Sequence, residues 1–274
     1  MIPVLIGITF INFCIINLAP GDAVDLMIDP NVSEADKKVR REALGLDDPF
    51  LVRYFGWMRE LVRGNLGYSY ATYEPVAKRV GERVKPTLIL GGVSMLLAYA
   101  LALPLGIASA VKPYSWVDYL TSLLGLAGVA LPTFFSGLVF IYVFSLKFDW
   151  FPSGGMHSLG QPGGGADLVR HMVLPVLVLT LTNIGLILRL VRSSTLEVLR
   201  QDYIRTAWAK GLPLRLVVFR HALRNSLIPI ITMAGLQLPT LIAGSVITEQ
   251  VFQWPGMGWL TVQAILSRDY PTLM

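Results

Sequence analysis

Long uncharged stretches of apolar residues alternate with polar stretches along the chain. A helix needs about 20 apolar residues to cross the hydrocarbon core of a bilayer, and five runs approach or exceed that length. They cover residues 1–18, about 87–111, about 119–146, about 172–188 and about 226–248. The tail, residues 256–274, is amphipathic and too polar to span. The pattern predicts an all-α polytopic membrane protein with about five spans.

The charged residues are unevenly distributed among the polar stretches. Residues 19–85 contain eleven acidic and eleven basic residues, and residues 147–170 are also balanced. Residues 189–224 contain eight basic and two acidic residues, a net charge of +6. Because Lys and Arg near the ends of spans stay in the cytoplasm, we expect 189–224 and the short turn 112–118 to be cytoplasmic. The two balanced stretches are then external.

The order of spans and loops predicts three parts. The first run lacks the basic start of a secretory signal and is long for one, so residues 1–18 are expected to form the first transmembrane helix. An external loop region follows at 19–85. The core, 86–274, contains a cytoplasmic loop at 194–224 that carries most of the positive charge.

Composition agrees with a multi-pass protein of a cell membrane. Hydrophobic residues make up 54% of the chain and charged residues 15%, and the mean hydropathy is +0.58, values typical of a membrane protein. The net charge of +5 belongs almost entirely to one loop, so a nucleic acid partner is not needed and membrane lipid is the expected surrounding. Cys14 is the only cysteine, so no internal disulfide can form.

Small residues and prolines punctuate the spans. Ala98, Ala102, Gly106 and Ala110 recur at every fourth position, a stripe that allows close helix contact in lipid. Either packing within the chain or a subunit interface would explain it. Prolines interrupt several spans and free backbone carbonyls, as expected of a bundle that encloses a path. They are Pro104, Pro132, Pro175, Pro229 and Pro239.

The four runs from 87 onward contain no Asp, Glu, Lys, Arg or His. Such charges are retained mainly where they move protons or ions, so an ion-coupled pump is not favoured. Asn183, Gln237 and the kink at Pro132 are candidates for lining a translocation path. The three histidines are far apart in sequence, and no HExxH or GxSxG motif occurs. We therefore expect no catalytic site and no metal site.

The basic loop carries signals for two short helices. "STLE" reads as a capping box with Ser194 as N-cap and Glu197 three residues later. Lys210 and Gly211 are typical of a helix end, and Pro213 of the start of the next helix. One apolar stripe is expected along the first helix. It consists of Leu196, Leu199, Tyr203 and Ala207.

The stretch "EVLRQDYIRTAWAKGL…RHALRNSLIP" resembles the cytoplasmic EAA loop of ABC importer permeases, in particular the dipeptide, oligopeptide and nickel transport family. Further segments that resemble this family, in family order, are "NLAPGD", "LGLDDPFLVRY", "GNLGYS", "PTFFSGL", "FPSGG", "LVRSSTLEVL" and "RDYP". Trp208 stands where the family commonly has arginine, and Pro213 where serine is usual. The family also has a sixth span and basic residues at both ends, so a shortened chain is expected.

The resemblance implies that the loop is a coupling helix that docks on an ATPase. The coupling residues are then Arg205, Thr206, Ala207, Trp208, Lys210, Gly211, His221 and Asn225. The implied partners are a second related permease, two ATPase subunits that hold ATP and Mg, and an extracytoplasmic solute-binding protein; this chain itself would bind no cofactor. Peptides are the implied cargo. Nickel or another small solute, an ion-coupled secondary transporter and a membrane scaffold remain the alternatives.

Overall fold

The computed structural model describes residues 2–18, 45, 47–158, 160 and 164–274, and the described part of the chain is mostly helical. Two compact units are present: residues 1–85 with 259–274, and residues 86–258. Of the expected external loop 19–85, residues 19–44 and 46 lie outside the described residues, and the described remainder includes a helix at Phe50–Val62 and the start of a helix at Val76. The helices are α1 (Ile2–Leu18), α4 (Phe50–Val62), α5 (Val76–Val111), α6 (Trp116–Ala130), α7 (Thr133–Phe140), η1 (Ile141–Lys147), α8 (Gly165–Leu199), α9 (Asp202–Ala209), α10 (Leu214–Leu216), η2 (Val217–Ala222), α11 (Leu223–Ala243), α12 (Val246–Val251), α13 (Met257–Leu266) and α14 (Tyr270–Leu273).

In the first unit, aromatic rings join α1 to α4. Phe10 and Phe13 of α1 make edge contacts with Tyr54 at centroid distances of 5.2 and 5.5 Å. Phe13 and Tyr54 are both buried. Edge-to-face pairs of this kind add to the free energy gained from burying the rings.

A buried carboxylate, Asp269, organises the rest of the first unit. It accepts hydrogen bonds from Ser69 Oγ at 2.5 Å, the Tyr70 amide at 2.8 Å and Thr272 Oγ1 at 2.7 Å. Arg79 Nη1 lies 2.7 Å from the same carboxylate. These contacts join the turn after α4, the start of α5 and the C-terminal helix α14, so "RDYP" has a structural role here.

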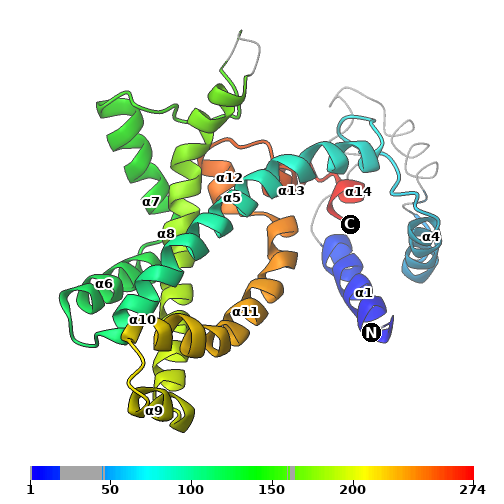
Figure 1. Cartoon of the computed structure of the whole chain (residues 1–274). Coiled ribbons are helices and arrows are strands. Elements are labelled where there is room, and N and C mark those ends of the chain that lie inside the picture. The colour runs from blue at the N-terminus through cyan, green and yellow to red at the C-terminus, as the bar shows by residue number, and fades with distance from the viewer. Residues whose placement is uncertain (1, 19–44, 46, 159, 161–163) are drawn as a thin grey trace. The chain divides into compact units, whose positions relative to one another are not determined.

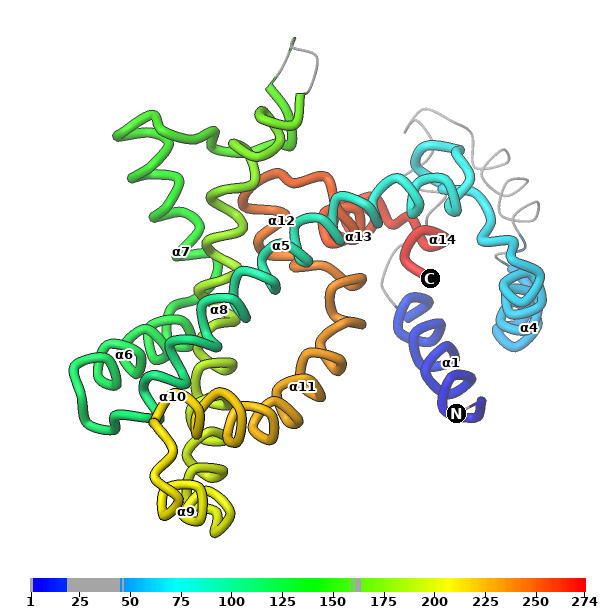
Figure 2. Tube along the Cα trace, in the orientation of Figure 1, coloured from blue at the N-terminus to red at the C-terminus, as the bar shows by residue number. Residues whose placement is uncertain are grey.

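In the second unit, α5, α8 and α11 share a core (Figures 1 and 2). Ala98 and Ala102 are fully buried in it beside Ile187 and Val191 of α8. A methyl group on Gly106 would lie 2.7 Å from Val191 Cγ1, so α8 approaches as closely as the small residue allows. The stripe that begins at Ala98 therefore packs within the chain, one of the two explanations the sequence left open.

Three helices are long and apolar enough to cross a membrane: α5, α8 and the continuous helix 214–243; the count refers to the described residues. The run predicted at 119–146 differs, because α6 and the following α7–η1 segment meet at 104°. Leu131 takes an extended conformation (φ −84°, ψ 123°), since Pro132 disfavours helical geometry at the preceding residue. Such a bent pair is either one broken span, which would be the fourth among the described residues, or a re-entrant loop.

Two other boundaries also differ from the prediction. The run expected at 226–248 already begins as a helix at Leu214 and ends at Ala243. Gly244 has φ +76°, a conformation that glycine adopts without strain, and it separates this helix from the short α12. At 17 residues, α1 is apolar but shorter than the other spans.

The turn 112–118 and the basic loop lie at the same end of the second unit. Lys112, Ser115 and Trp116 line a common cavity with Val218 and Phe219 of η2. In Figure 1, α9 and α10 are at the lower end and the link between η1 and α8 is at the upper end. This arrangement agrees with the charge pattern, which assigned both the turn and the loop to the cytoplasmic side.

Candidate coupling and translocation sites

The helix of the basic loop begins later than the sequence predicted. Ser194 is not an N-cap: α8 continues through it to Leu199, and Ser194 is buried inside that helix. Nothing between Ser194 and Leu199 interrupts a helix, and burial of α8 overrides the local capping preference. The break comes at Gln201 (φ −71°, ψ 150°), and Asp202 then begins α9. An acidic residue in this first turn is favoured by the helix dipole.

Gly211 ends α9 as predicted. Its φ is +73°, and its amide donates to the Trp208 carbonyl at 2.9 Å while the Leu212 amide donates to Ala207 at 3.4 Å. These are the two bonds of a Schellman motif, which satisfies carbonyl groups at the end of a helix. Pro213 directly precedes α10 as its N-cap, but α10, η2 and α11 form one continuous helix instead of a separate short one.

One face of α9 is buried, and only part of the predicted stripe contributes to it: Leu199 and Ala207 belong to the buried cluster. Ile204 and Ala207 pack with Val217 and Ala222 of η2, and Leu212 joins them. Tyr203 is 43% exposed. Leu196 and Leu199 belong to α8 because the helix break lies after them. The predicted stripe assumed one helix from Leu196 to Ala207. Because α8 ends at Leu199 and α9 begins at Asp202, the face of α9 that is buried differs from the predicted one.

Most of the predicted coupling residues share one exposed surface on α9 and its flanks. Arg205, Thr206, Trp208 and Lys210 are exposed, whereas Ala207 is buried beneath them. Asn225 Nδ2 donates to the Tyr203 hydroxyl at 2.8 Å and so connects the start of α11 to α9. His221 lies in η2, which packs on α9. The basic loop is thus a helix packed on the rest of the second unit, and not an unstructured segment of solvated charges.

The second group of predicted residues is only partly brought together. Asn183 lines a polar cavity of about 240 Å³ in the second unit, and Pro132 precedes Thr133 at its edge. Gln237 lies elsewhere and accepts a hydrogen bond from the Tyr99 hydroxyl at 3.1 Å. The polar residues that line the cavity are Thr87, Ser94, Thr133, Thr182, Asn183, Thr240, Ser245 and Glu249.

Glu249 is a residue of this cavity that sequence reasoning missed. It is 1% exposed and accepts a hydrogen bond from Thr87 Oγ1 at 2.9 Å. A methyl group on Gly244 would lie 2.8 Å from its Oε1, and one on Gly258 would lie 3.1 Å from its Oε2. The signal was present in "GSVITEQVFQWPGMG", where glycines flank an acidic residue, but that residue falls one position beyond the run predicted to end at 248.

A second missed feature is the ion pair between Arg192 and Asp118. Arg192 Nε and Nη2 lie 2.7 and 2.9 Å from the two carboxylate oxygens, and Ser109 Oγ donates to Asp118 at 2.5 Å. Asp118 is buried. The net charge of +6 assigned to 189–224 therefore includes one cation whose partner lies in the neighbouring turn.

Two of the three histidines, which are far apart in sequence, lie beside the same carboxylate. His157 Nδ1 and His171 Nδ1 lie 3.3 and 3.4 Å from different oxygens of Asp167, whose carboxylate also accepts from Ser158. The turn after Phe151 folds back on the start of α8 and brings them together. Among the described residues, no group of three or more His, Cys, Asp or Glu side chains is arranged to hold a metal ion.

Comparison with known proteins identifies the family. Residues 102–274 match the family of the binding-protein-dependent transport system inner membrane component, and residues 1–91 match the N-terminal region of such membrane components. The chain belongs to this family. It is a multi-pass inner membrane permease component of an ABC transport system, a non-catalytic subunit that works in a complex with partner proteins. An ion-coupled secondary transporter is not favoured.

Three similar proteins are peptide permeases, and each aligns along the whole of this chain. The chain is 43% identical to the oligopeptide transport system permease protein AppB of Bacillus subtilis, over 100% of this chain and 87% of that protein. It is 40% identical to the di/tripeptide transport system permease protein DppB of Pseudomonas aeruginosa and 36% identical to the dipeptide transport system permease protein DppB of Escherichia coli K12. Both alignments cover 100% of this chain and 87% of the relative.

Proposed function

We propose that this subunit imports dipeptides and oligopeptides. The names of the relatives support peptide cargo, since each is a peptide permease at 36–43% identity over the full chain. In this proposal a second related permease completes the membrane pore, and an extracytoplasmic binding protein delivers the peptide. Nickel import, the alternative within the same family, has no support from these relatives.

In the same proposal, two ATPase subunits with ATP and Mg drive the cycle through α9. The observation that carries this step is the construction of α9. Its inner face is fixed by Ile204 and Ala207, its end by Gly211, and its outer face presents Arg205, Trp208 and Lys210. A displacement of α9 is therefore passed to η2 and α11, because α9 packs directly on η2.

The path for the peptide is proposed to run along the cavity beside Asn183. Hydroxyl and amide groups can replace water around a peptide backbone without favouring one side chain. The Asn183 amide nitrogen already donates to the Leu179 carbonyl at 2.9 Å, and in this proposal the amide oxygen accepts a hydrogen bond from the cargo. A permissive lining suits a transporter of peptides with different sequences.

Cross-linking tests the ATPase contact. Trp208→Cys in the assembled transporter should form a disulfide or maleimide cross-link with an ATPase subunit, and the cross-link should change with ATP. Tyr142→Cys is the control, because Tyr142 is 63% exposed in η1, near the opposite end of the second unit. A cross-link to the ATPase from Tyr142→Cys and none from Trp208→Cys would overturn the assignment.

Uptake in proteoliposomes tests the cargo and the path. A labelled dipeptide should accumulate with ATP and the binding protein present, and excess nickel should not compete. Asn183→Leu should slow uptake, whereas Thr232→Val should not, because Asn183 lines the cavity and Thr232 does not. Nickel accumulation without peptide accumulation would reject the peptide assignment.

A further inference from the structure

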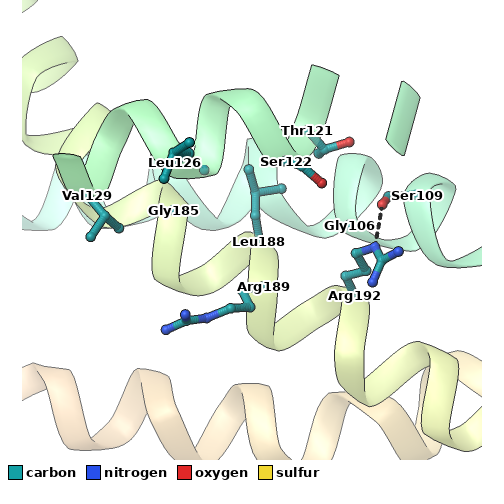
Figure 3. Close-up of a pocket in the computed structure, with 11 residues that line it drawn as sticks. Gly106, Ser109, Thr121, Ser122, Leu126, Val129, Gly185, Leu188, Arg189 and Arg192 are labelled. Carbon is teal, nitrogen blue, oxygen red and sulfur yellow. Dashed lines mark hydrogen bonds between the residues drawn. The ribbon is translucent and has the colours of Figure 1, made fainter. Parts of the chain in front are cut away.

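An open groove runs between α5, α6 and α8 near the end that carries the basic loop. Its volume is about 390 Å³. The helices that border it come close together at glycines, because a methyl group on Gly185 of α8 would overlap the Gly125 carbonyl oxygen of α6. Figure 3 shows side chains of α6 and α8 bordering the space.

The lining changes from polar to apolar along α6. Thr121 and Ser122 lie in the half of α6 nearest the 112–118 turn, and Leu126 and Val129 lie one and two turns further into the span. Ser122, Leu126 and Val129 are all exposed. Their spacing of four and three residues places them on one helix face. The groove therefore has a hydroxyl-bearing end at the cytoplasmic side and a hydrocarbon-like wall toward the membrane centre.

Two arginines of α8 line the groove, but only one is engaged within the described chain. Arg192 is held by Asp118. Arg189 is exposed and makes no hydrogen bond or ion pair with any described residue. Figure 3 shows the two side chains extending in opposite directions along α8, so Arg189 stands apart from the neutralised pair and gives the groove a net positive charge.

We propose that this groove binds one anionic phospholipid of the cytoplasmic leaflet. The Arg189 guanidinium pairs with the lipid phosphate, the Ser122 hydroxyl donates to the headgroup, and an acyl chain lies against Leu126 and Val129. Basic pockets between membrane helices on the cytoplasmic side are suited to anionic headgroups, and a long arginine side chain can adjust its reach to the interface. The +6 charge of residues 189–224 concentrates anionic lipid at the same end of the bundle.

Native mass spectrometry of the intact transporter tests the proposal. The complex is delipidated and titrated with phosphatidylglycerol or with zwitterionic phosphatidylcholine of the same chain length. We expect one tightly bound phosphatidylglycerol per copy of this chain and weaker binding of phosphatidylcholine. Arg189→Gln should weaken phosphatidylglycerol about fivefold, the effect of one basic residue near an anionic surface.

Matched variants separate this site from the rest of the basic surface. Arg215→Gln removes an exposed arginine outside the groove and should leave the bound lipid unchanged. Leu126→Trp keeps the charge and fills the apolar half, so it should also reduce phosphatidylglycerol binding. Unchanged thermal unfolding midpoints show that these variants are folded.

Three results would overturn the proposal. Equal losses for Arg189→Gln and Arg215→Gln would mean diffuse attraction to the basic surface. Displacement of the lipid by inorganic phosphate at equal concentration would mean a site for free anions. Efficient cross-linking of Ser122→Cys to the second permease would mean that protein covers the groove.

Discussion

Arg192 of α8 donates hydrogen bonds to both carboxylate oxygens of Asp118 at the start of α6, from Nε at 2.7 Å and from Nη2 at 2.9 Å. The Tyr114 amide donates to the same carboxylate at 2.9 Å, so the turn between α5 and α6 is tied to α8 two residues before Ser194. Asp118→Ala would leave Arg192 without its partner. The Arg192 side chain is 34% exposed, and we expect a loss of about 2–3 kcal/mol, less than for a fully buried pair.

The thermal unfolding midpoint of the purified complex measures this loss. The control is Glu60→Gln, which removes an exposed pair with Arg63 at 3.4 Å and should cost under about 1 kcal/mol. Exchanging the charges, Asp118→Arg with Arg192→Asp, should recover part of the lost midpoint. Equal midpoints for Asp118→Ala and Glu60→Gln would show that the buried pair contributes no more than an exposed one.

The crossing of α6 and α8 depends on Gly128. A methyl group there would overlap the Leu181 carbonyl oxygen, and a backbone atom cannot move aside as a side chain can. Gly128→Ala should therefore destabilise the second unit by about 1–3 kcal/mol and reduce the yield of folded protein in gel filtration. Gly92→Ala should be neutral or slightly stabilising, because no atom lies within 4 Å of its added methyl group. A normal yield for Gly128→Ala would mean that the helices separate easily.

Thr87 connects Glu249 to the segment that begins α13. Its hydroxyl donates to Glu249 at 2.9 Å and accepts from the Met257 amide at 2.7 Å. Thr87→Val keeps the shape and removes both bonds, which should lower stability by about 1–3 kcal/mol. Thr182→Val is the comparison, because the Thr182 hydroxyl donates to the Val178 carbonyl of its own helix and does not connect two segments. Similar midpoints for the two variants would contradict a special role of Thr87.

The left-handed conformation of Gly211 predicts a defect in coupling without a defect in assembly. Gly211→Val places a β-branched residue at φ +73°, which costs on the order of 1–2 kcal/mol and loosens the end of α9. ATP-driven peptide uptake should fall while membrane insertion is retained, and Gly211→Asn should be milder because asparagine tolerates this conformation.

Gly64→Val is the control for the Gly211 experiment. Gly64 has φ +78° and, like Gly211, no atom within 4 Å of an added methyl group, but it lies outside the basic loop. Its replacement should impose the same local strain and leave the ratio of peptide imported to ATP hydrolysed unchanged. If both variants lower that ratio equally, the defect does not arise from the changed end of α9.

The sequence was sufficient for most of the membrane architecture and for the end of α9. Apolar runs located α5, α8 and α11, since burial in lipid requires them whatever their neighbours are. Gly211 was identified as a helix end because only a few residues suit that conformation. The family resemblance was confirmed by the matches over residues 1–91 and 102–274.

What the sequence could not supply depends on contacts between distant residues. The capping box at Ser194 was wrong because packing of α8 outweighs a local preference, and as a consequence only Leu199 and Ala207 of the predicted stripe lie in the buried cluster. The pairing of Asp118 with Arg192 and the meeting of His157 with His171 at Asp167 join residues far apart in the chain or in different elements. Hydropathy also could not show the 104° bend after Leu131.

The segment η2 (Val217–Ala222) is a π-helical turn inside the long helix 214–243, and α9 packs on it. A π turn accommodates one residue more than an α turn over a similar rise. Converting it to α geometry would rotate the preceding backbone by about 100° relative to α11, with no peptide bond broken and no helix unwound. The part of this helix that contacts α9 thus contains one residue more than an α-helix would. A displacement of α9 can therefore change the helical winding of η2 as well as move α11.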